Sequence, residues 1–347
     1  MKYTINFEKE INLMLRNNIG LCPYFRNNGH RFSERFLDIE CFYQKQVQSK
    51  YIHSFLTKNG MFYLRNLLKN EVAFDNPLFY MLFKAFVYAE IKFIYNFVPQ
   101  NSHEERLTGH LVSEIANSLS IIKETFEQKA FELYHSNVIL EFHYADLSAN
   151  NNEKNTGADL GLIFHINLPD YQEKVNVAII QSKKFNNNAR IDLMQIDTLQ
   201  KYAKNYAYYC FYDMNMDERN SPLIQKANTI TSFINNDKRE SSCGIKSLDR
   251  TDIVNGWDGG IPLSIFLIFD MLNSENENIK SFDSIWEAKS IIEGINDTNR
   301  NKSINTYNKV FKASRVLTVS VGGVSNSSQD LRDISKLFRF NEYSEHD

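Results

Sequence analysis

The chain has 347 residues, of which 43% are hydrophobic and 23% are charged, and it includes 26 Phe and 18 Tyr. This length allows two ordinary domains or one catalytic core with sizeable additions, and the aromatic content excludes the disordered class of proteins. The formal net charge of -3 at pH 7 gives no general attraction for nucleic acid, so any contact with DNA needs a local basic patch.

The cysteines and the first residues favour a cytoplasmic protein. Cys22, Cys41, Cys210 and Cys243 show neither CxxC pairing nor zinc-type spacing, which argues against a disulfide scaffold and a structural metal site. Residues 1–15 carry acidic and polar side chains where a signal peptide needs a continuous apolar stretch. We therefore expect the protein to work in a reducing cytoplasm.

Residues 1–102 are predicted to form a helical N-terminal region, because apolar side chains recur there at three- and four-residue intervals. The most apolar window, Pro77 to Val98, has the length of a membrane span but contains Lys84, Glu90 and Lys92. Ionised groups cost roughly 2.5 to 3.5 kcal/mol each near a bilayer centre. We therefore expect a buried helix here and no association with a membrane.

Residues 103–235 are predicted to form the core, in the order helix, three strands, helix, strand. An apolar stripe predicts the first helix and places Glu114 on its border, while period-two alternation predicts the strands. The second and third strands are expected to pair as a hairpin. The predicted ranges are 107–122 for the first helix, 138–147, 159–168 and 175–183 for three strands, 191–204 for the second helix and 206–212 for the fourth strand.

Residues 236–347 are expected to form a mixed C-terminal extension that packs on this core. The pattern after Pro222 predicts a helix over 223–233 and a polar linker over 235–242. It also predicts a buried element over 262–272 and a strand over 316–321.

Three polar residues of the second and third strands carry the chemistry. Because side chains alternate across a strand, Gln181 and Lys183 project to one face and Ser182 to the other. In a hairpin, both would meet Asp159. A hard divalent cation needs oxygen ligands, which Asp159 and Gln181 offer, and a nearby ammonium such as that of Lys183 suits phosphodiester hydrolysis. Glu114 of the preceding helix is expected to supply a second carboxylate and to act as a further catalytic and metal-binding residue.

These residues resemble a known family. The stretch GADLGLIF, followed by IIQSK with Gln181 placed 22 residues after Asp159, is similar to the PD-(D/E)xK nuclease superfamily, in particular its Mrr-like restriction branch. The Gly109 to Glu114 segment resembles that branch's helical motif. The resemblance covers residues 104–213. This chain departs from the commoner pattern by carrying Gln181 in place of an acid, which leaves the number of bound metal ions open.

The resemblance implies a restriction-endonuclease-like α/β core, a mixed α-β-β-β-α-β sheet flanked by helices, with helical N-terminal and mixed C-terminal additions. It implies a Mg²⁺-dependent endonuclease that acts on DNA in restriction or anti-phage defence, with Mn²⁺ as a substitute metal. Asp159, Gln181 and Glu114 would be metal ligands, and Lys183 the catalytic lysine. Homo-oligomers or other defence-system subunits are the expected protein partners, and RNA is not excluded as a substrate.

A local basic surface would hold the nucleic-acid backbone. Lys184, Arg190 and Lys201 cluster in sequence around the predicted site, and Gln195 matches a polar position of related sequences; we expect these four residues to contact nucleic acid. Two alternatives stay open: a decayed module that binds nucleic acid without cutting it, and a helical interaction scaffold within a defence complex. A titration with divalent metal separates them, since a scaffold binds none.

Overall fold

The structure, a computed structural model, describes residues 74, 76–146, 158–186, 188–214, 221–240, 251–255, 261–272, 281–282, 285–295, 309–311 and 313–323. The helices predicted over residues 1–73 and the polar turn before Ala158 lie outside these described residues. The same holds for Cys22, Cys41 and Cys243.

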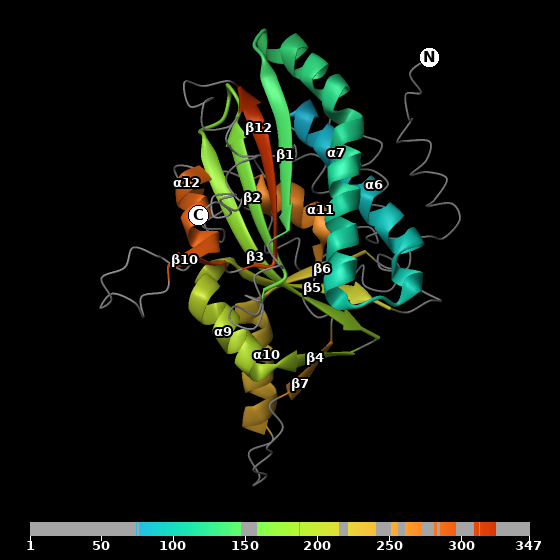
Figure 1. Ribbon diagram of the computed structural model, residues 1–347, viewed down its shortest axis with the longest axis vertical. Helices are drawn as coiled ribbons and strands as arrows, with labels where there is room; N and C mark the ends of the chain where they lie inside the picture. Colours follow the sequence, from blue (N-terminus) through green and yellow to red (C-terminus); the bar gives the residue numbers. More distant parts are fainter. Residues whose placement is uncertain are drawn as a thin grey trace, which may run out of the picture.

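A mixed eight-stranded sheet forms the centre of the described chain (Figure 1). The strand order is β1-β12-β2-β3-β5-β6-β8, with β9 paired to β3. Two neighbouring pairs, β12 with β2 and β3 with β5, are parallel, and the other pairs are antiparallel. The strands are β1 Val138–Asp146, β2 Leu160–Asn167, β3 Lys174–Phe185, β5 Ala207–Asp213, β6 Leu223–Lys226, β8 Ile261–Pro262, β9 Ser281–Phe282 and β12 Arg315–Gly323.

The four strands predicted within residues 138–212 are confirmed as β1, β2, β3 and β5. The expected hairpin pairing is also present, because β2 and β3 are antiparallel neighbours with Leu160 opposite Ile180. A strand is present at 316–321 as well, within β12. These segments were predictable because apolar side chains follow a strand period and turn residues separate them.

The position of β12 differs from the expectation that residues 236–347 only pack on the core. This strand lies inside the sheet, antiparallel to β1 and parallel to β2. Its residues from Val316 to Val321 are buried, as in a strand covered on both faces. The C-terminal part of the chain is therefore integral to the sheet that carries the site.

The region around residues 186–255 also differs in detail from the prediction. A short strand, β4 (Asn188–Asp192), precedes α9 (Leu193–Ala203) and pairs with β7 (Thr251–Asn255) outside the main sheet. The helix predicted to begin at 223 starts later, as α10 (Ala227–Glu240), because buried Leu223 and Ile224 pair with β5 instead. The predicted linker over 235–242 is wrong, since α10 continues to Glu240.

Helices cover both faces of the sheet (Figure 1). On one face, α6 (Pro77–Asn96) contacts β2 through Phe86 and Phe164, whose ring centroids are 6.1 Å apart. On the other face, α12 (Ile285–Ile292) sits so close to β2 that a Cβ added to Gly161 would lie 2.9 Å from Ile292 Cδ1. The remaining elements are 3₁₀ turns Val98–Gln100 and Lys204–Tyr206, α7 Glu104–Tyr134, α11 Leu263–Ile265, a π-helical turn Phe266–Met271, and strands β10 Glu293–Ile295 and β11 Lys309–Phe311, which pair.

The helix predicted over 77–98 is confirmed as the buried α6. Asn76 caps its N-terminus by accepting a hydrogen bond from Leu78 N at 2.9 Å, and Pro77 occupies the first turn, both typical of helix starts. Fourteen of its residues are buried, including Glu90. Within the described part of the chain, no helix has both the length and the apolar character that crossing a bilayer requires.

Candidate active site

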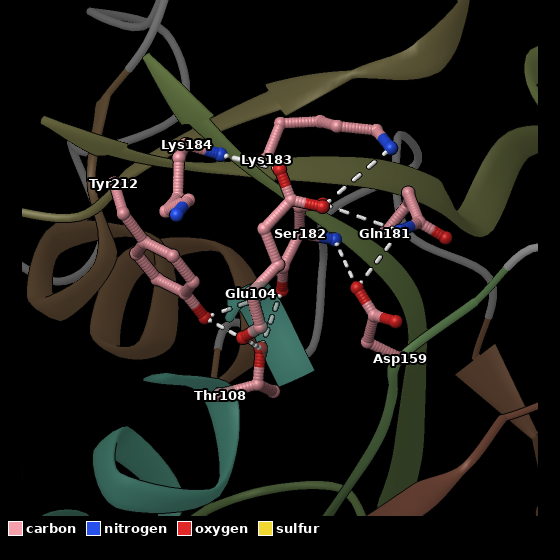
Figure 2. Close-up of polar contacts among 8 residues, drawn as sticks. All are labelled: Glu104, Thr108, Asp159, Gln181, Ser182, Lys183, Lys184 and Tyr212. Atoms are coloured by element: carbon pink, nitrogen blue, oxygen red, sulfur yellow. Dashed lines mark hydrogen bonds and ion pairs between the residues drawn. The ribbon is translucent and has the colours of Figure 1, made fainter. Parts of the chain in front are cut away.

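The register of the β2–β3 hairpin brings Asp159 beside Gln181. Asp159 immediately precedes β2, and its backbone N–H donates to Ile180 O at 2.9 Å. Gln181 Nε2 then donates to Asp159 Oδ2 at 2.8 Å, and Ser182 N donates to the same oxygen at 2.7 Å (Figure 2). Residues that face each other across an antiparallel pair share one side of the sheet, so these two side chains meet as the alternation predicts.

Lys183 lies on the same face as Gln181, while Ser182 points to the opposite face toward α7. Ser182 Oγ accepts a hydrogen bond from Thr108 Oγ1 of α7 at 2.8 Å. Lys183 Nζ lies 3.7 Å from Glu104 Oε2, and its side chain is 16% exposed. The hairpin therefore presents a carboxylate, an amide and an ammonium together on one face.

Glu104 is a site residue that sequence reasoning missed. Its Oε1 accepts a hydrogen bond from Lys184 N at 2.9 Å, and its Oε2 faces Lys183 Nζ. One side chain at the start of α7 therefore holds the end of β3 in place. The sequence signal was present but ambiguous, because Glu104 and Glu105 in a first turn are what the helix dipole favours anyway.

Asp159, Gln181 and Lys183 line a cleft of about 780 Å³. The first three turns of α7 form one wall, through Glu104, Arg106 and Gly109 among others, and Tyr144 and Asp146 at the end of β1 form another. Gln195 of α9 and Arg315 of β12 also line it. The cleft is therefore built from five separate elements and carries charges of both signs.

Burial makes Asp159 hard to ionise in the absence of a cation. The residue is 2% exposed, and this burial raises the pKa of its carboxyl from 3.8 to about 6, although the Ser182 hydrogen bond and the charge of Lys183 act in the opposite direction. A nearby positive ion would favour the carboxylate. The site is thus suited to bind a cation near neutral pH.

Two oxygen atoms in the site are left available for a ligand. Gln181 is 4% exposed, and within the described part of the chain its Oε1 has no hydrogen-bond partner. Figure 2 shows this oxygen turned away from the Asp159 oxygen that Nε2 contacts. Among the described residues, Asp159 Oδ1 also accepts no hydrogen bond, since both bonds go to Oδ2. A buried acceptor without a partner costs about 1 to 3 kcal/mol, which favours a site that a ligand completes.

This oxygen pair fits a hard cation such as Mg²⁺, which binds proteins through one or two oxygen side chains and keeps several waters. The described residues hold no group of three or more His, Cys, Asp or Glu side chains arranged around an ion. A Mg²⁺ ion at this place would rest on Asp159 and Gln181, with water and substrate oxygens completing its shell.

Glu114 is not brought to this group. It does not line the cleft; the charge that acts on it is that of Lys92 of α6, while partial burial raises its pKa. The reason is geometric, because on one helix Glu114 lies about 15 Å further along the axis than Glu104 and about 80° around it. The carboxylates that α7 brings to the cleft are Glu104 and Glu105.

Of the four residues expected to contact nucleic acid, Gln195 alone lines the cleft. Lys184 Nζ is 3.3 Å from Asn101 Oδ1, on the far side of β3 from Lys183. Arg190 is exposed on β4. Lys201 is exposed on α9, with its Nζ 5.8 Å from the Tyr202 ring centroid. A substrate would have to extend beyond the cleft to touch these three.

Three buried hydroxyls support the back of β3. Tyr212 OH lies 3.0 Å from Thr108 Oγ1 and 3.2 Å from Ser182 Oγ (Figure 2), so α7 and β5 are tied to the residue whose N–H holds Asp159. Tyr212→Phe should lower the free energy of unfolding by about 1 kcal/mol, because a buried hydrogen-bonded hydroxyl is lost. Urea unfolding measures this change, with exposed Tyr202→Phe as the control; an unchanged midpoint for Tyr212→Phe would contradict it.

No protein-family model, curated protein or solved structure matches this chain.

Proposed function

We propose that this protein is a metal-dependent nuclease that hydrolyses phosphodiester bonds in DNA, with Asp159, Gln181 and Lys183 in its active site. The observation that carries the proposal is their meeting on one face of the β2–β3 hairpin, inside one cleft. Had the strands paired one residue out of register, Asp159 would face the opposite side from the other two.

Each residue has a role that its surroundings support. Asp159 and Gln181 would hold Mg²⁺ through Oδ1 and Oε1, which accept no hydrogen bond from the described residues. When bound, Mg²⁺ supplies a Lewis acid beside the scissile phosphate and lowers the pKa of bound water. The ammonium of Lys183 offsets the negative charge that develops on the phosphate and helps to orient the attacking water. Glu104 keeps that ammonium at the cleft.

DNA is the proposed substrate, and restriction or anti-phage defence the proposed setting; both rest on the resemblance of GADLGLIF and IIQSK to Mrr-like nucleases. The cleft offers three cations that a phosphate backbone could contact, Arg106, Lys183 and Arg315, beside four acids, Glu104, Glu105, Asp146 and Asp159. In a chain with a net charge of -3, contact with phosphates depends on such individual cations.

Purified protein should cut plasmid, linear or single-stranded DNA when Mg²⁺ or Mn²⁺ is present and should stop when a chelator is added. Asp159→Ala should abolish the cutting, and Lys183→Ala should slow it by about 10² to 10³-fold. Matched controls are Asp170→Ala, an exposed acid just beyond β2, and Lys129→Ala, a half-buried lysine far along α7. RNA of the same sequence tests the sugar preference. Cutting that Asp159→Ala and Lys183→Ala both retain would place the activity elsewhere or in a contaminant.

The same assay separates the two rival functions. A decayed module would bind DNA without cutting it under any metal, and an interaction scaffold would show no metal binding by calorimetry. The proposed nuclease both binds Mg²⁺ and cuts, and it loses both properties with Asp159.

A further inference from the structure

Arg315 reaches the cleft from a part of the sequence far from the hairpin. It is the first residue of β12, where it pairs with Leu160 of β2 on one side and Asp146 of β1 on the other. Its backbone N–H donates to Asp159 O at 3.1 Å. The main chain of Arg315 is therefore fixed directly to the residue that carries the proposed metal ligand.

The guanidinium group of Arg315 is buried but incompletely paired. The residue is 9% exposed, and its Nε and Nη1 atoms have no hydrogen-bond partner among the residues that the structure describes. The nearest acid is Asp146, with Oδ2 3.7 Å from Nε, which is too long for a hydrogen bond. Asp146 is also 46% exposed in its side chain, so water screens its charge.

The side chain of Arg315 packs against α7 at Gly109. A Cβ added to Gly109 would lie 3.6 Å from Arg315 Nε, which is an ordinary van der Waals distance. A buried cation with free N–H groups is costly unless something pairs with it. Since Arg315 lines the same cleft as Lys183, an anion that enters the cleft would be placed to pair with it.

We propose that Arg315 binds a phosphodiester group of the nucleic acid in the cleft and fixes the strand next to Asp159. This inference rests on the proposed function and names a binding residue for it. An arginine is suited to the task because its planar fork donates two parallel hydrogen bonds to phosphate oxygens. Lys183 then contacts the phosphate that reacts, and Arg315 binds the backbone of the nucleic acid.

Asp146 supplies the discriminating variant. If Arg315 only forms a cross-strand ion pair, Asp146→Asn and Arg315→Gln remove the same interaction and should have the same effect. If Arg315 binds phosphate, Asp146 competes with the substrate, because both are anions facing one guanidinium. Asp146→Asn should then leave DNA binding unchanged or stronger, while Arg315→Gln weakens it.

The test measures binding of a labelled 30-base-pair DNA duplex by fluorescence anisotropy in EDTA, at several salt concentrations. Arg315→Gln should weaken binding about 10-fold or more, as expected for a lost charged contact. It should also lower the salt slope by about one. Arg315→Lys should fall between Arg315→Gln and the wild type, and Lys129→Gln, with the same change of charge on the far part of α7, should match the wild type. Thermal unfolding of each variant checks the fold. If Arg315→Gln does not fold, the binding measured for Arg315→Lys, which keeps the charge and an aliphatic stem, tests the proposal instead.

Three outcomes would overturn the inference: a wild-type protein that does not bind the duplex, Arg315 variants that bind as the wild type does, or Asp146→Asn weakening binding as much as Arg315→Gln. The nuclease proposal is judged separately, by Mg²⁺-dependent cutting and its loss in Asp159→Ala. Binding that depends on Arg315 in a protein that never cuts DNA would sustain the inference and remove the nuclease. Cutting that depends on Asp159, with binding indifferent to Arg315, would do the reverse.

Discussion

Asp159→Asn should yield a protein that no longer cuts DNA and yet is more stable than the wild type at pH 8. The asparagine can keep both hydrogen bonds, because its single oxygen can accept from Ser182 N and Gln181 Nε2 as Oδ2 does. What it removes is the negative charge, and with it the anionic metal ligand. We therefore expect no detectable cutting in Mg²⁺.

The gain in stability follows from the raised pKa. The folded protein holds the Asp159 proton up to a pKa of about 6, against 3.8 for the unfolded chain. Because the folded state binds the proton more tightly, wild-type stability falls as pH rises from about 4 through about 6. Above that pH range the folded wild type bears the full cost of a buried carboxylate charge. The side chain of the Asp159→Asn variant is uncharged and avoids this cost, so the free energy of unfolding of the variant should be about 1 to 3 kcal/mol higher at pH 8. The difference should shrink toward zero near pH 4.

Urea unfolding of both proteins between pH 4 and pH 8 measures this difference. Glu90→Gln is a matched control, since burial also raises the pKa of Glu90, to about 7, and Glu90 does not line the cleft. Glu90→Gln should also stabilise the fold at pH values above the pKa of Glu90, but it should leave cutting intact. Addition of Mg²⁺ should stabilise the wild type and Glu90→Gln more than Asp159→Asn. A variant at 159 that is less stable at pH 8 than the wild type would contradict the buried-charge account.

Lys183→Met should slow cutting by about 10² to 10³-fold with little change in stability. A loss of this size is usual when one group that stabilises transition-state charge is removed. The pair that it forms with Glu104 at 3.7 Å is partly exposed and contributes less than about 1 kcal/mol to folding. Single-turnover rates at saturating DNA isolate the chemical step from binding.

The neighbouring Lys184→Met is the matched control for this change. Lys184 lies one residue further along β3, where its Nζ contacts Asn101 on the other side of the strand. It should leave the single-turnover rate close to that of the wild type, even if DNA binds more weakly. Equal losses from the two variants would mean that general positive charge, and not the position of Lys183, supports cutting.

The hairpin part of the site was predictable from the sequence, because it depends on local rules. Alternation within a strand sets which side chains share a face, and the polar turn between two apolar runs predicts their pairing. Asp159, Gln181 and Lys183 therefore meet through interactions between neighbouring strands. Fold class at the level of a mixed sheet with flanking helices followed from the same pattern.

The rest depended on packing between distant segments, which periodicity does not encode. Glu114 and Glu104 occupy the same helix, and only the way α7 docks on β3 decides which carboxylate reaches the site. Arg315 offers no local signal either, since its position between Asp146 and Leu160 comes from the pairing of strands that lie far apart in the sequence. Most of the cleft wall was therefore beyond sequence reasoning.

The placement of β12 between β1 and β2 has a consequence for synthesis on the ribosome. Until that strand has emerged, β1 and β2 have unpaired edges, which attract other chains, and closing so long a loop is slow. A fragment that ends at residue 235 should therefore aggregate. A nascent chain would also lack Arg315 and the hydrogen bond that its N–H donates to Asp159 O. The cleft would therefore stay incomplete until β12 has joined the sheet.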